Sequence, residues 1–515
     1  MKQKLNKKEK TTLNNSLKLI AKSSFILFLF IIFSKIITLL YRIVISGISP
    51  EVYGLFSLAV MVSGWIIAFA SLGLLGGVIR YAAYYRGKKE INKINYLIKI
   101  SLTASLISSI LGGILLFILA EFISIQIFNK PDLIIYLKGF SLVIPLTILS
   151  GIFLSIIQAF EKVKTYSFLR NVLDNSIKLL VLIILITIGL KTKAVIISYI
   201  SGMLIVSIIA FYICKHKIPA LFQKHKLDKK TKNKIKKELL SYSWPLIFTG
   251  LVAFIFSWLD LFAIGYFIED VAQAGIYSAA VPLAALMAIA PSLFIQLFFP
   301  LITKEFAKRD NKVIREMSKQ IGKWILIINL PFLILILLFP GAIINLFFKP
   351  EYLAASQSLR FLAIGMFFYS IFIVSENLLS MAGKSKIVLS NIIIASILNL
   401  ILNFLLVPKY GINGAAFATM MTYILWSFLS LAQAHNKTKI IPVKTKMLII
   451  LIISTIPTII LFYTKKIIPP NSITLALQTS LFLLIYILLI FTTKSLDKND
   501  LMVLTAIKNK VKEKI

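Results

Sequence analysis

Long apolar runs constrain the fold of this chain more than any other feature. Stretches of about twenty residues that are almost entirely apolar recur from residue 19 to residue 491, and about twenty such residues are what an α-helix needs to cross the hydrocarbon core of a bilayer. Hydrophobic residues make up 58% of the chain, compared with roughly 45–50% in a soluble domain. The sequence therefore predicts an all-α integral membrane protein with many spans.

Fourteen membrane helices are predicted, six in each of two halves and a final pair. The expected ranges are 19–45, 53–79, 97–123, 133–160, 166–190 and 194–213, then 243–267, 275–303, 321–347, 353–381, 387–407 and 414–434, and lastly 447–463 and 473–491. The first run is longer than the apolar part of a cleaved signal peptide, and no small-x-small cleavage site follows it. We expect it to remain as a helix.

The second half of the chain repeats the first. Four pairs of positions match at nearly constant spacing: Gly54 with Gly275 (offset 221), 128–132 with 347–351 (219), Lys164 with Lys386 and Gly189 with Gly411 (both 222). A constant offset indicates a duplicated unit. Many transporters place two such repeats around a central site and open the path to each side in turn.

Polar segments separate the expected regions. These are a cytoplasmic tail (1–18), an N-terminal six-helix lobe (19–213), a basic linker (214–242), a C-terminal six-helix lobe (243–434), a cytoplasmic loop (435–446), an extra helix pair (447–491) and a second cytoplasmic tail (492–515). The linker is rich in lysine, with ten of them between Lys215 and Lys237. The two lobes and the pair together give a tandem-repeat architecture of fourteen helices.

The charge pattern predicts the orientation. The formal charge of +37 comes from cations in short loops, where they set topology and contact anionic membrane lipids. Cations gather on one side and acidic residues on the other, which places both termini in the cytoplasm of a multi-pass protein of the inner membrane. We expect no nucleic-acid partner.

Catalytic and metal chemistry are not expected. Cys214 is the single cysteine, and the three histidines (216, 225 and 435) lie in basic loops, so no cysteine–histidine metal cluster or cofactor is predicted. A glycan polymerase or ligase needs a long catalytic loop outside the membrane, and none is present. The chain is expected to be a transporter.

Charged residues inside the predicted spans need an explanation, because each costs about 2.5–3.5 kcal/mol on insertion scales. Lys35 and Arg42 lie seven residues apart on one face of the first helix. A water-filled cavity explains Lys35 best, whereas Arg42 has two readings, function or snorkelling to the outer headgroups. Asp174 and Lys178 are four residues apart, so we expect them to neutralise each other.

The second half carries its own buried charges. Asp260 has no charged neighbour three or four residues away on its helix and is the best acidic candidate, while Glu376 and Arg360 lie on the helix 353–381. Three asparagines, 391, 399 and 403, form a polar stripe on the helix 387–407. We interpret this stripe as a contact that holds helices together.

Several motifs resemble one known family. They are Ser34-Lys35 with Arg42, the run 50–56 (PEVYGLF), the run 260–267 (DLFAIGYF) with 275–280 (GIYSAA), 350–353 (PEYL) with Leu359-Arg360, and 399–403 (NLILN) running into 407–416 (VPKYGINGAA). In this order they resemble the polysaccharide-transport flippases of the multidrug/oligosaccharidyl-lipid/polysaccharide (MOP) exporter superfamily. The resemblance covers essentially the whole chain, and the extra helix pair is similar to that of the fourteen-helix flippases.

The resemblance implies two six-helix lobes around a central cavity and, as cargo, a polyprenyl-pyrophosphate-linked oligosaccharide moved from the inner to the outer leaflet. It also implies that the cations of the first helix meet the lipid pyrophosphate. We predict pyrophosphate binding by Lys35, Arg42 and Arg360, and cation coupling or charge pairing at Asp260, Glu376 and Asp174. Glycosyltransferases or a polymerase of the same pathway are candidate partners.

The alternative function is a Na⁺- or H⁺-coupled multidrug exporter of the same superfamily. A site for organic cations favours an acidic lining, but the buried charges in this chain are mainly basic. The driving force is open among Na⁺, H⁺ and the membrane potential, which contributes about 2.3 kcal/mol per charge per 100 mV.

Overall fold

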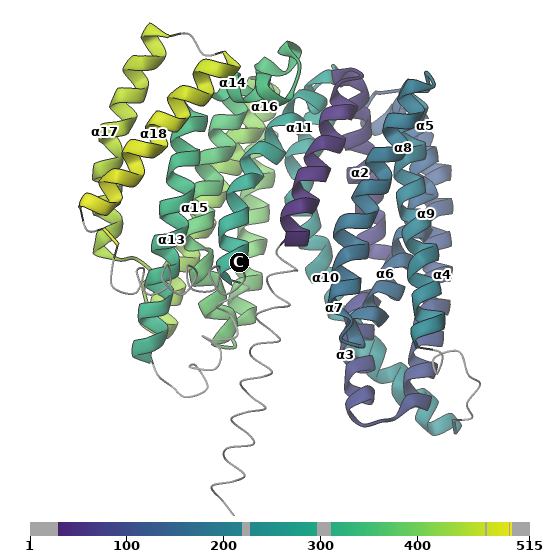
Figure 1. Ribbon diagram of the computed structural model, residues 1–515. Coiled ribbons are helices and arrows are strands. Elements are labelled where there is room, and N and C mark those ends of the chain that lie inside the picture. The colour runs from purple at the N-terminus through teal and green to yellow at the C-terminus, as the bar shows by residue number, and fades with distance from the viewer. Residues whose placement is uncertain (1–28, 219–226, 296–310, 469–470, 494, 497–515) are drawn as a thin grey trace, which may run out of the picture. The chain divides into compact units, whose positions relative to one another are not determined.

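The computed structural model describes residues 29–218, 227–295, 311–468, 471–493 and 495–496. The described regular structure is helical throughout (Figure 1), and it contains 12 helices that are long and apolar enough to cross a membrane. These findings confirm the all-α membrane class. The expected tail 1–18, part of the basic linker, the end of the helix 275–303 and most of the tail 492–515 lie outside the described residues.

The chain forms two compact units, which we describe one at a time. The first contains residues 1–283, 348–358 and 389–422, and the second contains 284–347, 359–388 and 423–515. These boundaries differ from those of the lobes 19–213 and 243–434 expected from the sequence repeat. The division into tandem lobes therefore stays a prediction.

The first unit begins with the helix Leu29–Ser46. Its further helices are α2 (Pro50–Ala70), α3 (Leu74–Gly87), α4 (Ile91–Phe122), η1 (Ile123–Ile127), α5 (Leu133–Ser141), α6 (Val143–Ala159), α7 (Val163–Ser167), η2 (Phe168–Leu173), α8 (Asp174–Thr187), α9 (Lys191–Lys217), α10 (Lys229–Phe267), α11 (Ala272–Ala284), η5 (Pro350–Ala355) and the middle of α16 (Ser385–Thr438). Capping residues define the starts of two of these. Ser49 accepts a hydrogen bond from the Val52 amide at the start of α2, and Asp228 accepts one from the Thr231 amide at the start of α10, as helix N-caps commonly do.

The second unit contains the C-terminal part of the chain. Its helices are η4 (Ala285–Ala288), α13 (Asn311–Leu338), α14 (Pro340–Phe347), most of α15 (Ser356–Met381), both ends of α16, α17 (Thr445–Ile467) and α18 (Ser472–Thr492). The extra helix pair expected at 447–491 corresponds to α17 and α18, which pack against each other. Tyr486 of α18 donates a hydrogen bond to the Ile327 carbonyl of α13.

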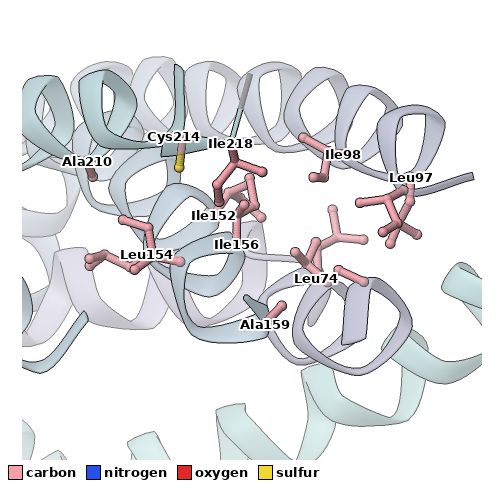
Figure 2. Close-up of a cluster of buried hydrophobic side chains, with 14 of the residues drawn as sticks. Leu74, Leu97, Ile98, Ile152, Leu154, Ile156, Ala159, Ala210, Cys214 and Ile218 are labelled. Atoms are coloured by element: carbon pink, nitrogen blue, oxygen red, sulfur yellow. The ribbon is translucent and has the colours of Figure 1, made fainter. Parts of the chain in front are cut away.

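The core of the first unit lies where α3, α4, α6 and α9 meet. Figure 2 shows Leu74, Leu97, Ile156 and Cys214 among the side chains that fill it, and all four are buried. Ile235 and Leu239, at the start of α10, belong to the same cluster. Burying these side chains holds the polar beginning of α10 against the helices of the N-terminal half.

Two expected helices are interrupted. The helix expected at 53–79 ends at Ala70, because the backbone turns at Leu72 and Gly73, both with positive φ, before α3 begins. The segment expected as one helix at 166–190 divides into α7, the π-helical η2 and α8. None of these three pieces is long enough to be among the 12 candidate spans.

Helices were predicted at 387–407 and 414–434, and the 54 residues of α16 consist of two helical segments joined by a kink. The Asn399 amide lies 3.1 Å from the Thr419 hydroxyl. Twenty residues of straight helix would separate them by about 30 Å, so the chain turns back between them, at Gly411 (φ 57°, ψ −138°). The expected count of fourteen helices stays a prediction.

Candidate functional site

The first unit contains a buried polar cluster around Asp260. Asp260 lies seven residues before the end of α10, between the buried residues Leu259 and Leu261. Its Oδ1 accepts hydrogen bonds from Asn403 Nδ2 (3.0 Å) and Asn399 Nδ2 (3.4 Å). The three polar side chains therefore join α10 to α16.

The other carboxylate oxygen has two hydroxyl partners. Thr419 donates a hydrogen bond to Asp260 Oδ2 at 2.5 Å, and the Tyr277 hydroxyl of α11 also donates to this oxygen. Thr419 comes into reach because the backbone turns back at Gly411. Three helical segments thus place four neutral donors around one carboxylate.

No cationic side chain balances Asp260 within the described part of the chain. The ion pairs found there are Arg86–Glu161, Lys93–Glu90 and Lys178–Asp174. Asn403 is fully buried, and its Oδ1 has no hydrogen-bond partner. Rotating the two amides would turn their oxygens toward the carboxylate, because the O and N positions of an asparagine side chain exchange by a flip.

The resulting ligand set suits a hard cation. Carboxylate, amide and hydroxyl oxygens are the ligands that such ions prefer, and transporters hold Na⁺ at similar oxygen-lined sites within broken helices. The described residues contain no group of three or more His, Cys, Asp or Glu side chains that could hold a metal. A carboxylate among neutral oxygen ligands can take up a cation or a proton.

Asp174 has a different environment. Lys178 Nζ lies 2.8 Å from Asp174 Oδ2 and 3.9 Å from the centre of the Tyr199 ring. The Lys178 side chain is buried and the Asp174 side chain is mostly buried, and Gly202 of α9 leaves room for both. Asp174 and Lys178 therefore form the ion pair that their spacing of four residues suggested.

The first helix carries Lys35 and Arg42. Lys35 is exposed on the protein surface and Arg42 is half-buried, close to the Tyr53 hydroxyl. The two cations are near enough to each other to interact electrostatically. Neither has a carboxylate within 4 Å among the described residues.

Arg360 and Glu376 lie in the second unit. Arg360 Nε donates a hydrogen bond to the Leu337 carbonyl (3.0 Å), and Lys465 donates to the Leu338 carbonyl. These carbonyls end α13, where cations are favoured. Arg360 therefore stabilises a helix end in this structure, and its expected role toward pyrophosphate stays a prediction. Glu376 is half-buried near Tyr369.

Sequence reasoning identified part of the Asp260 cluster and missed the rest. It singled out Asp260, and it placed Asn399 and Asn403 on one helix face, but it treated them as separate features. Tyr277 and Thr419 were not recognised. The signal that could have pointed to Thr419 is the Pro408–Gly411 segment, because proline and glycine between the expected helices 387–407 and 414–434 favour a turn.

Two family models match this sequence. The model described as polysaccharide biosynthesis protein covers residues 20–306, more than half of the chain. The MatE model covers residues 245–405, which include Asp260, Asn399 and Asn403.

Three curated relatives are membrane or transport proteins by name, and two of them carry transport names. An uncharacterized membrane protein of Methanocaldococcus jannaschii is 26% identical over 76% of this chain and 79% of its own length. A Haloferax volcanii protein named "Probable low-salt glycan biosynthesis flippase" is 25% identical over 51% of this chain and 52% of its own. A Shigella flexneri protein named "Putative O-antigen transporter" is 24% identical over 74% of this chain and 90% of its own length.

Solved structures share the fold. The lipid II flippase MurJ in an inward closed conformation aligns with a TM-score of 0.69 at 21% identity, covering 90% of this chain and 98% of that one. An inward-facing MATE-family multidrug resistance transporter of the MOP superfamily aligns with a TM-score of 0.65 at 14% identity, covering 79% and 94%. These findings confirm the resemblance found in the sequence and the transporter class. The chain belongs to the polysaccharide biosynthesis protein family.

Proposed function

We propose that this protein is a flippase that moves a polyprenyl-pyrophosphate-linked oligosaccharide from the inner to the outer leaflet of the cytoplasmic membrane. Alternating access is the expected mechanism, and cell-surface polysaccharide biosynthesis is the expected pathway. Fourteen spans and two cytoplasmic termini complete the proposal. Family membership supports the transport of a glycan lipid, and two relatives carry glycan-transport names.

The observation that carries the cargo assignment is the cation pair on the first helix. Lys35 and Arg42 share one face and have no carboxylate within 4 Å among the described residues. Two uncompensated cations on a membrane helix are costly, and a diphosphate group offers the matching charge. The headgroup would bind to these cations while the polyprenyl chain remains in the lipid.

A reconstituted assay tests this assignment. Proteoliposomes would contain a fluorescent oligosaccharide on polyprenyl pyrophosphate, and a membrane-impermeant quencher would report its arrival in the opposite leaflet. We expect the double variant Lys35→Ala/Arg42→Ala to slow translocation by at least about 100-fold, since each of the two lost charge-assisted contacts is worth about 1.5–3 kcal/mol. The matched control is Lys99→Ala, which removes an exposed cation from α4. Equal rates in the double variant and the wild type would refute the role of the cation pair.

Na⁺ entry is proposed to be coupled to cargo transport at Asp260. A Na⁺ ion bound among Asp260, Asn399, Asn403 and Thr419 would neutralise the carboxylate, and its entry down the gradient would reset the carrier after cargo release. The absence of a cationic partner in the described chain supports this role. If a proton performs the coupling instead, transport will respond to a pH gradient and not to Na⁺.

A multidrug exporter remains the second candidate, because the MatE model matches the segment that contains Asp260. The two functions separate in a host that lacks its own drug pumps. Expression of a multidrug exporter would raise the inhibitory concentrations of several organic cations. The flippase proposal predicts no change in any of them.

A further inference from the structure

Lys130 makes an unusual set of contacts. It lies between η1 and α5, and only 5% of its surface is exposed. Its ammonium group donates hydrogen bonds to the carbonyls of Phe128 (3.0 Å), Gly265 (2.8 Å) and Ile268 (2.9 Å). An ammonium group has three N–H donors, so all of them are used, and two bind the end of α10.

Lys349 makes the corresponding contact from the second half of the chain to the end of the first helix. Its ammonium donates a hydrogen bond to the Gly47 carbonyl (2.7 Å), and the Tyr352 hydroxyl donates to the Ser46 carbonyl (3.0 Å). Ser46 is the last residue of the first helix. In both places a lysine binds the carbonyl end of a membrane helix, where the helix dipole favours a positive charge.

The two contacts are equivalent in the sequence repeat. Lys130 matches Lys349 at an offset of 219, and Gly47 matches Ile268 at 221. Each lysine therefore binds the end of the first helix of the opposite repeat. All the residues involved belong to the first compact unit.

Two matched glycines lie between these contacts. A Cβ added to Gly54 of α2 would stand 2.2 Å from the Val271 carbonyl oxygen, and one added to Gly275 of α11 would stand 2.0 Å from that of Pro50. Pro50 and Val271 also match at an offset of 221. The starts of α2 and α11 thus touch backbone to backbone, and a side chain on either glycine would separate them.

We propose that Lys130 and Lys349 are reciprocal latches that hold the two repeats together at the outer face, and that their release opens the outward path. These are the ends that the charge pattern predicts to face outside. The latch consists mainly of polar contacts to helix-end carbonyls, which water can replace when the repeats separate. The proposal rests on the proposed function only in assuming an alternating-access transporter with this orientation.

The two latches differ in strength. Lys130 is buried and makes three bonds, whereas Lys349 is exposed and makes one. Loss of one charge-assisted bond changes an equilibrium by about tenfold or more. Lys130→Met should therefore raise the ratio of open to closed outer gate by at least about tenfold, and Lys349→Met should raise it less.

Spin-label distances test the latch without any substrate. In a Cys214→Ser background, labels at Glu51→Cys and Glu269→Cys flank the contact from opposite repeats, and both positions are exposed. We expect one short distance in the unaltered latch and an additional longer distance in Lys130→Met. A second pair, at Glu51→Cys and Lys191→Cys, lies within the N-terminal repeat and should not change.

The matched control for charge removal is Lys138→Met. Lys138 is exposed on α5 and faces the Phe117 ring at 5.6 Å, so its loss should leave both distances unchanged. If the distance between the repeats is unchanged in Lys130→Met, the proposal is wrong. Equal broadening of the distance distributions of both label pairs would also overturn it, because that result indicates general destabilisation. Because the measurement involves no cargo, a wrong substrate assignment would leave its result intact.

Discussion

Asp174 and Asp260 are both set among the helices of the first unit, but their charges are balanced in different ways. Asp174 has Lys178 at 2.8 Å, one helical turn along α8. Asp260 has four neutral partners, Tyr277, Asn399, Asn403 and Thr419, contributed by α11 and α16. The first aspartate is neutralised by a lysine of its own helix, whereas the second has no cationic partner among the described residues.

We propose that Asp174 is a structural charge and that Asp260 is a functional one. An ion pair that is complete within the protein needs no ligand, and its main consequence is for stability. A carboxylate that has only neutral donors in a membrane protein must take up a proton or a metal cation, or carry the cost of its charge. The comparison therefore predicts that changes at the two sites affect different measurements.

The largest expected effect is on stability at the Asp174–Lys178 pair. Lys178→Met leaves Asp174 buried without its counter-ion, which costs about 3–5 kcal/mol. The double variant Asp174→Asn/Lys178→Met removes both charges and should recover most of this loss. Thermal unfolding of the purified protein in detergent measures both. If the single and double variants unfold at the same temperature, the unpaired charge of Asp174 is not the cause of the lost stability.

The second effect is on coupling. Asp260→Asn removes the charge that attracts the cation, so stimulation of transport by a Na⁺ gradient should disappear, with a loss in Na⁺ affinity of about 100-fold. In Na⁺-free buffer the variant should be at least as stable as the wild type, because an uncompensated charge has been removed. Counterflow assays with and without a Na⁺ gradient measure the first result. Retained Na⁺ stimulation would show that the coupling site lies elsewhere.

A smaller effect is expected at Thr419. Thr419→Val keeps the shape of the side chain and removes one hydroxyl from the cluster, so Na⁺ affinity should fall by about tenfold. Thr422→Val is the matched control, because the Thr422 hydroxyl bonds to the Ala418 carbonyl within its own helix. Equal Na⁺ affinity in Thr419→Val and this control would exclude Thr419 from the site.

The smallest effect is expected at Tyr277. Tyr277→Phe removes one hydrogen bond to Asp260 Oδ2 and leaves the other three donors in place. A single hydrogen bond of this kind is worth about 0.5–1.5 kcal/mol, so a change of a few-fold in Na⁺ affinity is expected. A change as large as that of Asp260→Asn would mean that Tyr277 itself binds the ion.

The membrane class and the family could be predicted from sequence, and Asp260 could be singled out as an isolated charge, because apolar runs and isolated charges are local features. The asparagines were also visible as a stripe of spacing four. Their contact with Asp260 was not, since it depends on how α10 packs against α16. Thr419 joins the cluster only because the chain reverses at Gly411, and sequence spacing alone does not reveal which side chains a reversal brings together.

The same limit explains Arg360. The sequence shows a cation in an apolar helix, which suggests an anionic ligand. The structure shows that its Nε bonds to the last turn of α13, a contact made between segments that are distant in sequence. Breaks such as the one at Leu72 and Gly73 were also missed, because the apolar run continues through the turn.

Direct binding of ²²Na⁺ to the purified protein tests the central claim most closely, that Asp260 takes its counter-charge from solution. The measurement would be made at constant ionic strength with choline as the replacement cation, on the wild type and on Asp260→Asn and Asp174→Asn/Lys178→Met. We predict saturable binding to the wild type and to the double variant, and binding about 100-fold weaker to Asp260→Asn. Wild-type affinity in Asp260→Asn, or loss of binding in the double variant, would contradict the account.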